Sequence, residues 1–394
     1  MRRALRFAVP GLVLILLALG LHLFIQRQLG TAAPPPAPSP TEAPAQVPVP
    51  SETPIPTATV VPTTAPTAAP TASVPPKPTS PPQPTSTPAP PPTATPTPGP
   101  IVTNDKLGVG VYTPGLPVPA LRTLRPAMLL MEDPDPRAVS DLRAIFPKAL
   151  IVGRHYVPDG DRSLANCSDP NEDHTAKGIA FADNLARTAV PLRQIVDAWV
   201  SDNEQTSHDR PQDYPCHAAF QVGFIETMQD KYHIAAVAGN DAAGAIEPSD
   251  YPKYFAKPIS MATYFGIHAY GKPESRRLNN GPESQYYALR YRTIHDELVQ
   301  ARVPLPKGLS DRGGGGFLLT ETGVYEGYRG MVDDTNMAND FIWLEQQTEQ
   351  DRYVTGQFVF GIGTQGTRFG PYEIMGTSVI DVLGQFNAQH AGTP

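Results

Sequence analysis

The feature that most constrains the fold is an alternation that begins at Asp105 and runs to the end of the chain. Short, β-favouring apolar runs recur eight times, over 107–112, 127–132, 149–157, 195–203, 234–240, 263–270, 317–323 and 356–363. Their apolar residues are too continuous for strands with one face in water. The runs therefore predict the strands of a sheet that is covered on both faces.

Longer stretches with helical spacing separate most of these runs. Apolar residues recur three and four positions apart, as at Ala219, Val222, Phe224, Ile225 and Met228. Such stretches lie at 136–146, 176–190, 216–232, 284–301, 336–351 and 377–390, with weaker candidates at 117–124 and 248–256. Strands joined by helical crossovers pair in parallel. Eight such units in about 290 residues predict an α/β fold, a closed (β/α)8 TIM barrel, rather than an open doubly wound sheet.

Nucleotide-binding and serine-hydrolase motifs are missing from the sequence. The first apolar run is followed by no G-x-G-x-x-G, and neither G-x-x-x-x-G-K-[ST] nor G-x-S-x-G occurs anywhere. The glycines at 313–316 lead into the seventh run, and no helix follows them directly. This glycine run is therefore interpreted as a connector rather than a phosphate loop.

Carboxylates stand near the ends of two predicted strands. The fourth run leads into Asn203 and Glu204 in "VDAWVSDNEQ", and the seventh carries Glu321 in "FLLTETGVY". The carboxyl ends of barrel strands form the active site, so these side chains are expected to face each other across the mouth. Glycoside hydrolysis uses such a pair, one carboxyl group as proton donor and the other as nucleophile.

These motifs resemble the clan of retaining glycoside hydrolases with a (β/α)8 barrel and catalytic glutamates on strands 4 and 7, which includes cellulases, β-glucanases and mannanases. The resemblance rests on "DNE" ending the fourth run, "TETG" in the seventh and "HAY" in the sixth. It implies that Glu204 is the acid/base, Glu321 the nucleophile and Asn203 the donor to the sugar 2-hydroxyl. It also implies that His268 lines the site and that Tyr270 contacts the nucleophile. No cofactor is implied.

Two further positions follow from the same resemblance. Arg154, near the end of the third run, corresponds to a cation beside the nucleophile that keeps it ionised. Phe360 stands near the end of the eighth run, where the clan usually has a tryptophan, and is expected to offer a flat apolar surface. This departure leaves a second hypothesis open, a catalytically inactive barrel that binds cell-surface glycan or a protein. A distance beyond roughly 10 Å between the two carboxylates would favour that alternative.

The loops at the predicted strand ends carry cysteines and aromatic residues. Cys167 and Cys216 lie on the loops after the third and fourth runs, so a disulfide across the rim is reasonable, with two free thiols as the alternative. The histidines of these loops, His217 among them, and the aspartates match no zinc or EF-hand spacing. They are expected to be solvated loop residues, and no metal site is expected. Tyrosines at strand ends are candidates either for stacking on sugars or for packing: Tyr112, Tyr156, Tyr270, Tyr325 and Tyr328. Trp199, inside the fourth run, is expected in the core.

The first 104 residues divide into two segments. Residues 1–30 carry Arg2, Arg3 and Arg6 before an uncharged apolar run of 19 residues, 7–25. This pattern predicts a transmembrane signal anchor with its N-terminus in the cytoplasm, and secretion after cleavage of a signal peptide is the alternative. Residues 31–104 form a Pro/Thr/Ala-rich spacer and are expected to be disordered. Residues 31–100 alone contain 26 of the chain's 48 prolines.

Charge completes the expectation for residues 105–394, the predicted glycoside-hydrolase-like domain. The first 30 residues have a net charge of +4 and the spacer has a net charge of −1. Because the whole chain has a net charge of −7, residues 105–394 have a net charge of −10. Such an acidic domain argues against a nucleic-acid partner. The expected partners are a carbohydrate substrate and, through the N-terminal helix, the cell membrane, with the catalytic domain outside. We expect a monomer.

Overall fold

A computed structural model describes residues 99–103, 105–113, 115–157, 162–311 and 315–392. The predicted anchor over 1–30, nearly all of the spacer over 31–104, and part of the glycine run lie outside these residues. Within the described part of the chain, no helix is both long and apolar enough to cross a bilayer.

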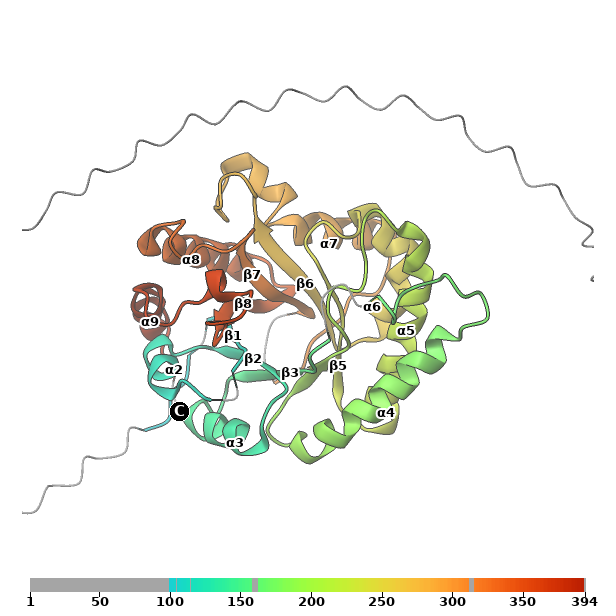
Figure 1. The fold of residues 1–394 in the computed structure, drawn as a ribbon, viewed down its shortest axis with the longest axis horizontal. Coiled ribbons are helices and arrows are strands. Elements are labelled where there is room, and N and C mark those ends of the chain that lie inside the picture. The colour runs from blue at the N-terminus through green and yellow to red at the C-terminus, as the bar shows by residue number, and fades with distance from the viewer. Residues whose placement is uncertain (1–98, 104, 114, 158–161, 312–314, 393–394) are drawn as a thin grey trace, which may run out of the picture. The chain divides into compact units, whose positions relative to one another are not determined.

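Eight strands form a closed barrel in which each strand pairs in parallel with the next and β8 pairs with β1. The predicted fold class is therefore confirmed for the described residues, and all eight predicted strands are present. Figure 1 shows the strands at the centre with helices around them. The strands are β1 (Leu107–Val111), β2 (Met128–Glu132), β3 (Leu150–Arg154), β4 (Ala198–Val200), β5 (Ala235–Asp241), β6 (Tyr264–Gly271), β7 (Phe317–Val324) and β8 (Val354–Ile362).

The helices follow the predicted order. They are α2 (Val118–Leu124), α3 (Pro136–Ile145), α4 (His174–Leu192), α5 (Tyr214–Glu226), α6 (Ala256–Met261), α7 (Arg290–Gln300), α8 (Asp334–Gln350) and α9 (Val379–Gln389). Aspartates cap three of them, since the side chains of Asp135, Asp173 and Asp333 accept hydrogen bonds from N–H groups in the first turns of α3, α4 and α8.

One predicted helix is shorter than its sequence pattern. The pattern indicates a helix over 284–301, but α7 begins at Arg290 and a separate 3₁₀ turn covers Gly281–Tyr286. The hydroxyl of Ser284 accepts a hydrogen bond from the N–H of Asn280 at 2.7 Å and donates to the carbonyl of Leu278 at 3.2 Å. These local bonds stabilise the turn and compete with the helix.

The barrel has an inner and an outer apolar layer. Inward-facing residues such as Leu130, Val152 and Leu318 fill its centre, while a larger cluster packs between strands and helices. Trp199 belongs to the outer cluster and is 1% exposed, which confirms its prediction as a core residue.

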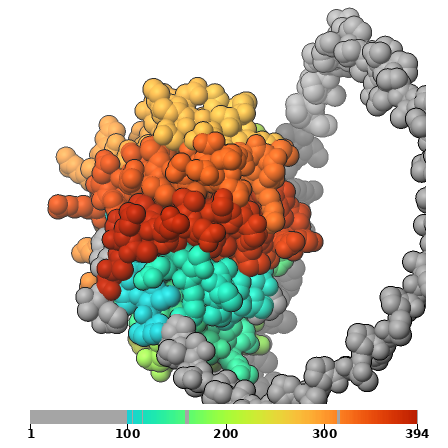
Figure 2. Space-filling model, turned by 90° about the vertical axis from the view of Figure 1, so that its left-hand side faces the viewer, coloured from blue at the N-terminus to red at the C-terminus, as the bar shows by residue number. Residues whose placement is uncertain are grey.

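The two ends of the domain meet on one side of the barrel. Figure 2 shows the C-terminal segment, in red, between the orange segment that includes α8 and the cyan segment that includes α2. Thr103 pairs with Ala391, and the N–H of Gly392 donates to the carbonyl of Val102 at 2.9 Å. Because residue 103 directly precedes β1, this junction lies at the N-terminal ends of the strands.

Candidate active site

A cavity of about 780 Å³ lies where the strands end, and six of the seven predicted site residues line it. These six are Arg154, Asn203, Glu204, Tyr270, Glu321 and Phe360. The seventh, His268, has a fully buried side chain directly behind Glu204. The cavity wall also takes residues from the ends of β1, β2 and β5, so it reaches around the whole mouth of the barrel.

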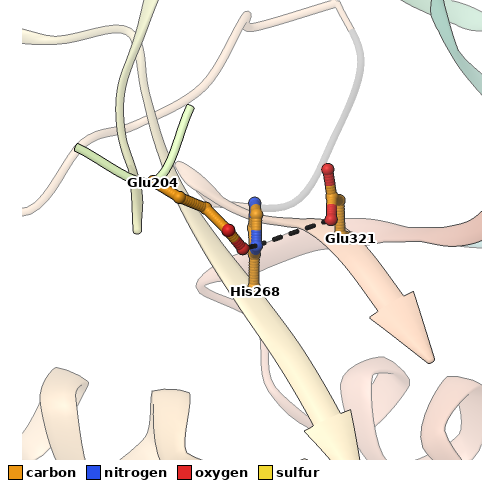
Figure 3. A group of neighbouring side chains, drawn as sticks. All are labelled: Glu204, His268 and Glu321. Atoms are coloured by element: carbon orange, nitrogen blue, oxygen red, sulfur yellow. Dashed lines mark hydrogen bonds and ion pairs between the residues drawn. The ribbon is translucent and has the colours of Figure 1, made fainter. Parts of the chain in front are cut away.

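Glu204 and Glu321 come together with His268 between them. One oxygen of each carboxylate and a ring nitrogen of His268 all lie within 4.8 Å of one another (Figure 3). The Nδ1 atom of His268 is 2.8 Å from Glu204 Oε1 and 3.6 Å from Glu321 Oε2. Glu321 is 5% exposed, whereas about a third of the Glu204 side chain remains open to solvent. Neither carboxylate points into the apolar core.

The backbone places Glu204 in an uncommon conformation. Its φ of 49° lies in the left-handed region, as does the φ of 62° at Asn240, which lies near the end of β5. The N–H of Glu204 donates to the Asn240 carbonyl at 3.2 Å. The Asn240 side chain in turn donates to the carbonyl of Asp202 at 2.8 Å and to Asn203 Oδ1 at 2.7 Å. Surrounding contacts thus hold a backbone geometry that is costly for a glutamate.

A fully buried polar cluster supports the same segment from behind. The Nε2 atom of His217, on α5, lies 2.7 Å from Asp202 Oδ2, and Gln221 donates to both Asp202 oxygens. On the other side of Glu204, the hydroxyl of Thr206 donates to Asp241 Oδ1 at 2.9 Å. Both residues that flank the Asn203–Gln205 segment are therefore fixed to neighbouring elements.

Charges within this cluster shift two pKa values. Burial opposes a charge on His217, but the Asp202 and Asp241 carboxylates outweigh it and raise the pKa of His217. Burial raises the pKa of Asp241, which His217 and Thr206 partly offset. Sequence reasoning placed His217 among solvated loop residues, and this was wrong, because α5 begins at Tyr214 and turns the histidine inward.

Two donors hold the carboxylate of Glu321. Arg154 Nη1 lies 2.5 Å from Glu321 Oε1, and the hydroxyl of Tyr270 donates to Oε2 at 3.0 Å. Each oxygen of the carboxylate therefore has its own partner. Charge-assisted bonds of this kind fix the orientation of a carboxylate.

Arg154 also connects the nucleophile candidate to other parts of the wall. Its guanidinium binds Glu132 at 2.9 Å and Asn203 Oδ1 at 3.1 Å, and it lies over the ring of Tyr112, 5.2 Å from the centroid. Burial raises the pKa of Glu132, with Arg154 opposing. Tyr112 was predicted only as a candidate for stacking or packing. Glu132 was not predicted as a site residue, although it stands at the end of β2.

Opposing effects act on the pKa of Glu204. A general acid calls for a raised pKa, and burial does raise it. The hydrogen bond and positive charge of His268, together with two nearby arginines, outweigh burial and hold the pKa of Glu204 below its usual value. Burial works against a charge on His268, but Glu321 and Glu204 raise its pKa. Both shifts favour a proton on His268 over one on Glu204.

Aromatic side chains form much of the cavity wall. The ring of Phe360 packs edge-on against Tyr112, with centroids 4.7 Å apart, and against Tyr372 at 4.9 Å. Of the five strand-end tyrosines, Tyr112, Tyr156, Tyr270 and Tyr325 line the cavity. Tyr328 does not, because it is buried and donates to the carbonyl of Tyr372.

A disulfide joins Cys167 and Cys216, with Cα atoms 5.6 Å apart. It ties the long loop after β3 to the first turn of α5. The N–H of Cys167 also donates to Asp213 Oδ1 at 3.2 Å. A covalent link thus holds the loop after β3 to α5, next to the buried His217.

Glu204, His268 and Glu321 are also close enough together to share a metal ion. The Arg154 guanidinium already supplies a positive charge at Glu321. The expectation of a metal-free site remains a prediction.

Comparisons with known proteins give structural matches but no sequence family. No family model matches the chain, and no curated protein does either. A structure of Saccharomyces cerevisiae Gas2p in complex with laminaritriose and laminaritetraose matches at a TM-score of 0.49 and 12% identity, over 75% of this chain and 66% of that one. In another Gas2 structure the match spans 58% of the neighbour's length.

Two bacterial structures match over nearly their whole length. The endo-beta-1,4-glucanase Xac0029 from Xanthomonas axonopodis pv. citri has a TM-score of 0.47 and 11% identity, over 73% of this chain and 100% of that one. PbGH5A, a glycoside hydrolase family 5 enzyme from Prevotella bryantii B14, has a TM-score of 0.42 and 10% identity, over 72% and 96%. The function proposed below rests on the geometry of the site itself.

Proposed function

We propose that the domain is a glycoside hydrolase that cleaves O-glycosidic bonds of a poly- or oligosaccharide with retention of anomeric configuration. The observation that carries this proposal is the pair of carboxylates whose nearest atoms fall within 4.8 Å. Retaining enzymes hold the two carboxyl groups about 5–5.5 Å apart, whereas inverting enzymes leave about 6.5–9.5 Å for a water molecule. The spacing supports direct attack by one carboxylate.

Glu321 is the proposed nucleophile, because its carboxylate is held on both oxygens by Arg154 and Tyr270. It attacks the anomeric carbon while the bond from that carbon to the glycosidic oxygen breaks. Glu204 gives its proton to the departing oxygen, and a covalent glycosyl-Glu321 ester forms. Water then attacks the same carbon, Glu204 takes a proton from it, and the ester bond breaks to release the sugar and restore Glu321.

His268 supplies the proton that Glu204 needs in the first step. The two pKa shifts favour this proton on the imidazole in the free site, 2.8 Å from Glu204 Oε1. A sugar ring in the cavity excludes water from the pair, and this favours the uncharged form in which the proton lies on Glu204. Substrate binding thereby prepares the acid.

The proposed location is the outer face of a cell membrane, with the domain on a proline-rich spacer behind an N-terminal anchor. The basic and apolar pattern of residues 1–30 supports it. The disulfide between Cys167 and Cys216 also supports an exported domain, because disulfides persist in oxidising compartments. A monomer is proposed.

The test compares Glu204→Gln and Glu321→Gln with the parent protein on β-glucan, mannan, xylan and galactan polysaccharides. Glu283→Gln is the matched control, since Glu283 is exposed and pairs with Lys272 outside the cavity. We expect hydrolysis by the parent and the control and a loss of about 10³-fold or more in each site variant. Proton NMR of the first product reports its anomeric form, and inversion would refute the retaining mechanism.

The alternative is a catalytically inactive barrel that binds glycan or protein. Binding of a polysaccharide with no hydrolysis by the parent protein would favour it. Turnover in both glutamine variants at the parent rate would refute the assignment of the two glutamates.

A further inference from the structure

Two exposed tyrosines stand on opposite rims of the cavity. Tyr156 is 44% exposed and follows β3, and Tyr325 is 54% exposed and follows β7. Both line the same cavity as Glu204 and Glu321. In a closed barrel of eight strands in chain order, β3 and β7 lie four positions apart and so face each other across the mouth.

The backbone beneath each tyrosine is fixed by polar contacts. The N–H of Gly327 donates to the carbonyl of Val324 at 3.0 Å and closes a tight turn around Tyr325. Arg276 pairs with Glu326, in the same turn, at 2.9 Å. A ring on a fixed turn has little freedom left to lose when it binds a ligand.

Polar contacts also fix the backbone at Tyr156. Its N–H donates to Asp133 Oδ1 at 3.4 Å, and the same oxygen lies 2.6 Å from Nδ1 of His155. Asp133 follows β2, so the loop after β3 is attached to the neighbouring loop at the rim. Large exposed aromatic surfaces that line a cavity are unfavourable in water and suit an amphipathic ligand.

The catalytic pair lies between these two rims. A site that releases a terminal sugar needs binding positions mainly on one side of the bond that breaks, and a wall on the other. Here an exposed tyrosine stands on each of two opposite rims of the cavity that holds the catalytic pair. We propose that the cavity is a cleft that binds sugar units on both sides of the scissile bond, with Tyr156 and Tyr325 as opposite platforms, so that the enzyme cleaves internal bonds of a polysaccharide.

This inference rests on the proposed hydrolase function and adds to it which bond is cleaved. The test uses hexasaccharides of β-1,3-glucan, β-1,4-glucan, mannan, xylan and galactan that carry a fluorophore at the reducing end. Early products are separated by length for the parent and for Tyr156→Ala and Tyr325→Ala. Tyr286→Ala is the matched control, because Tyr286 is 63% exposed and does not line the cavity.

We expect the parent to give labelled products of intermediate length from the start. Each platform variant lowers kcat/KM on its hexasaccharide by about 3- to 10-fold. The two variants move the main cleavage position in opposite directions along the labelled chain, because each loses binding on a different side of the bond. Tyr286→Ala leaves both the rate and the position unchanged.

Release of a single terminal sugar or disaccharide as the only early product would overturn this inference and leave the hydrolase proposal standing. A shift in the same direction in both variants, or no shift in either, would also overturn it. No hydrolysis of any hexasaccharide by the parent would count against the hydrolase proposal and against this inference together.

Discussion

The hydroxyl of Tyr270 gives a sharp test of how Glu321, the proposed nucleophile, is held. Tyr270→Phe removes one oxygen atom and leaves the ring, whose centroid lies 6.2 Å from those of His268 and Tyr372, in place. The lost bond is the 3.0 Å contact to Glu321 Oε2, while Arg154 keeps its contact to Oε1. The variant therefore isolates one of two contacts that orient the carboxylate.

The magnitude follows from the charge on the acceptor. A hydrogen bond to a charged group contributes about 1.5–3 kcal/mol, which corresponds to roughly 10- to 150-fold in rate. Because Arg154 still holds the other oxygen, we expect the lower end, about 10-fold in kcat/KM. A misaligned nucleophile slows formation of the covalent bond, so kcat falls as well.

Tyr112→Phe is the matched control. Tyr112 lines the same cavity and also touches Arg154, but its hydroxyl is buried and has no hydrogen-bond partner among the described residues. Steady-state kinetics on the best polysaccharide of the panel measure both variants, and thermal unfolding checks that both are folded. A change below 2-fold in Tyr270→Phe, or an equal loss in Tyr112→Phe, would refute the proposed role of this contact.

Three further predictions concern stability. Burial raises the pKa of Asp105 to about 8, so the folded state retains a proton that the unfolded state releases above about pH 4. The free energy of unfolding should therefore fall as pH rises from about 4 to 8. Urea unfolding at several pH values measures this slope, and Asp105→Asn should flatten it. His217→Ala leaves Asp202 and Asp241 buried without their cationic partner and should cost about 3–5 kcal/mol of unfolding free energy. His208 is exposed, so His208→Ala should cost nothing measurable. Equal losses in the two variants would contradict the stabilising role of the buried cluster. Replacing Cys167 and Cys216 by serine removes a disulfide that spans 49 residues and should lower the free energy of unfolding by about 4 kcal/mol. Unfolding of the variant is compared with that of the parent, with and without reductant. An identical unfolding midpoint of the parent under both conditions would argue against the disulfide.

Much of the barrel could be predicted from the sequence because its periodicity is strong. Strands buried on both faces need continuous apolar runs, and these gave all eight strands within a few residues of their bounds. The predicted helix over 284–301 was too long, because the spacing of apolar residues carries no information on local side-chain hydrogen bonds such as those of Ser284.

The carboxylates at the site were within reach of sequence reasoning, but their surroundings were not. Glu204 and Glu321 stand beside predicted strand ends, so topology alone brings them to one mouth. Asp202, His217 and Asp241 are 15 to 39 residues apart. Only the packing of α5 against β5 and against the segment that follows β4 brings them into contact. The direction of the Glu204 pKa likewise depends on which atom of His268 faces it, and no sequence pattern carries that information.

The meeting of the two ends of the domain has a practical meaning for the proposed cleavage of large polymers. Thr103 and Ala391 pair beside the start of β1, and the cleft opens where the strands finish. A surface, bead or fusion partner joined at either end of the domain would therefore attach to the base of the barrel and leave the cleft open. A solid support should then leave access to long chains unimpaired, whichever end is used for coupling.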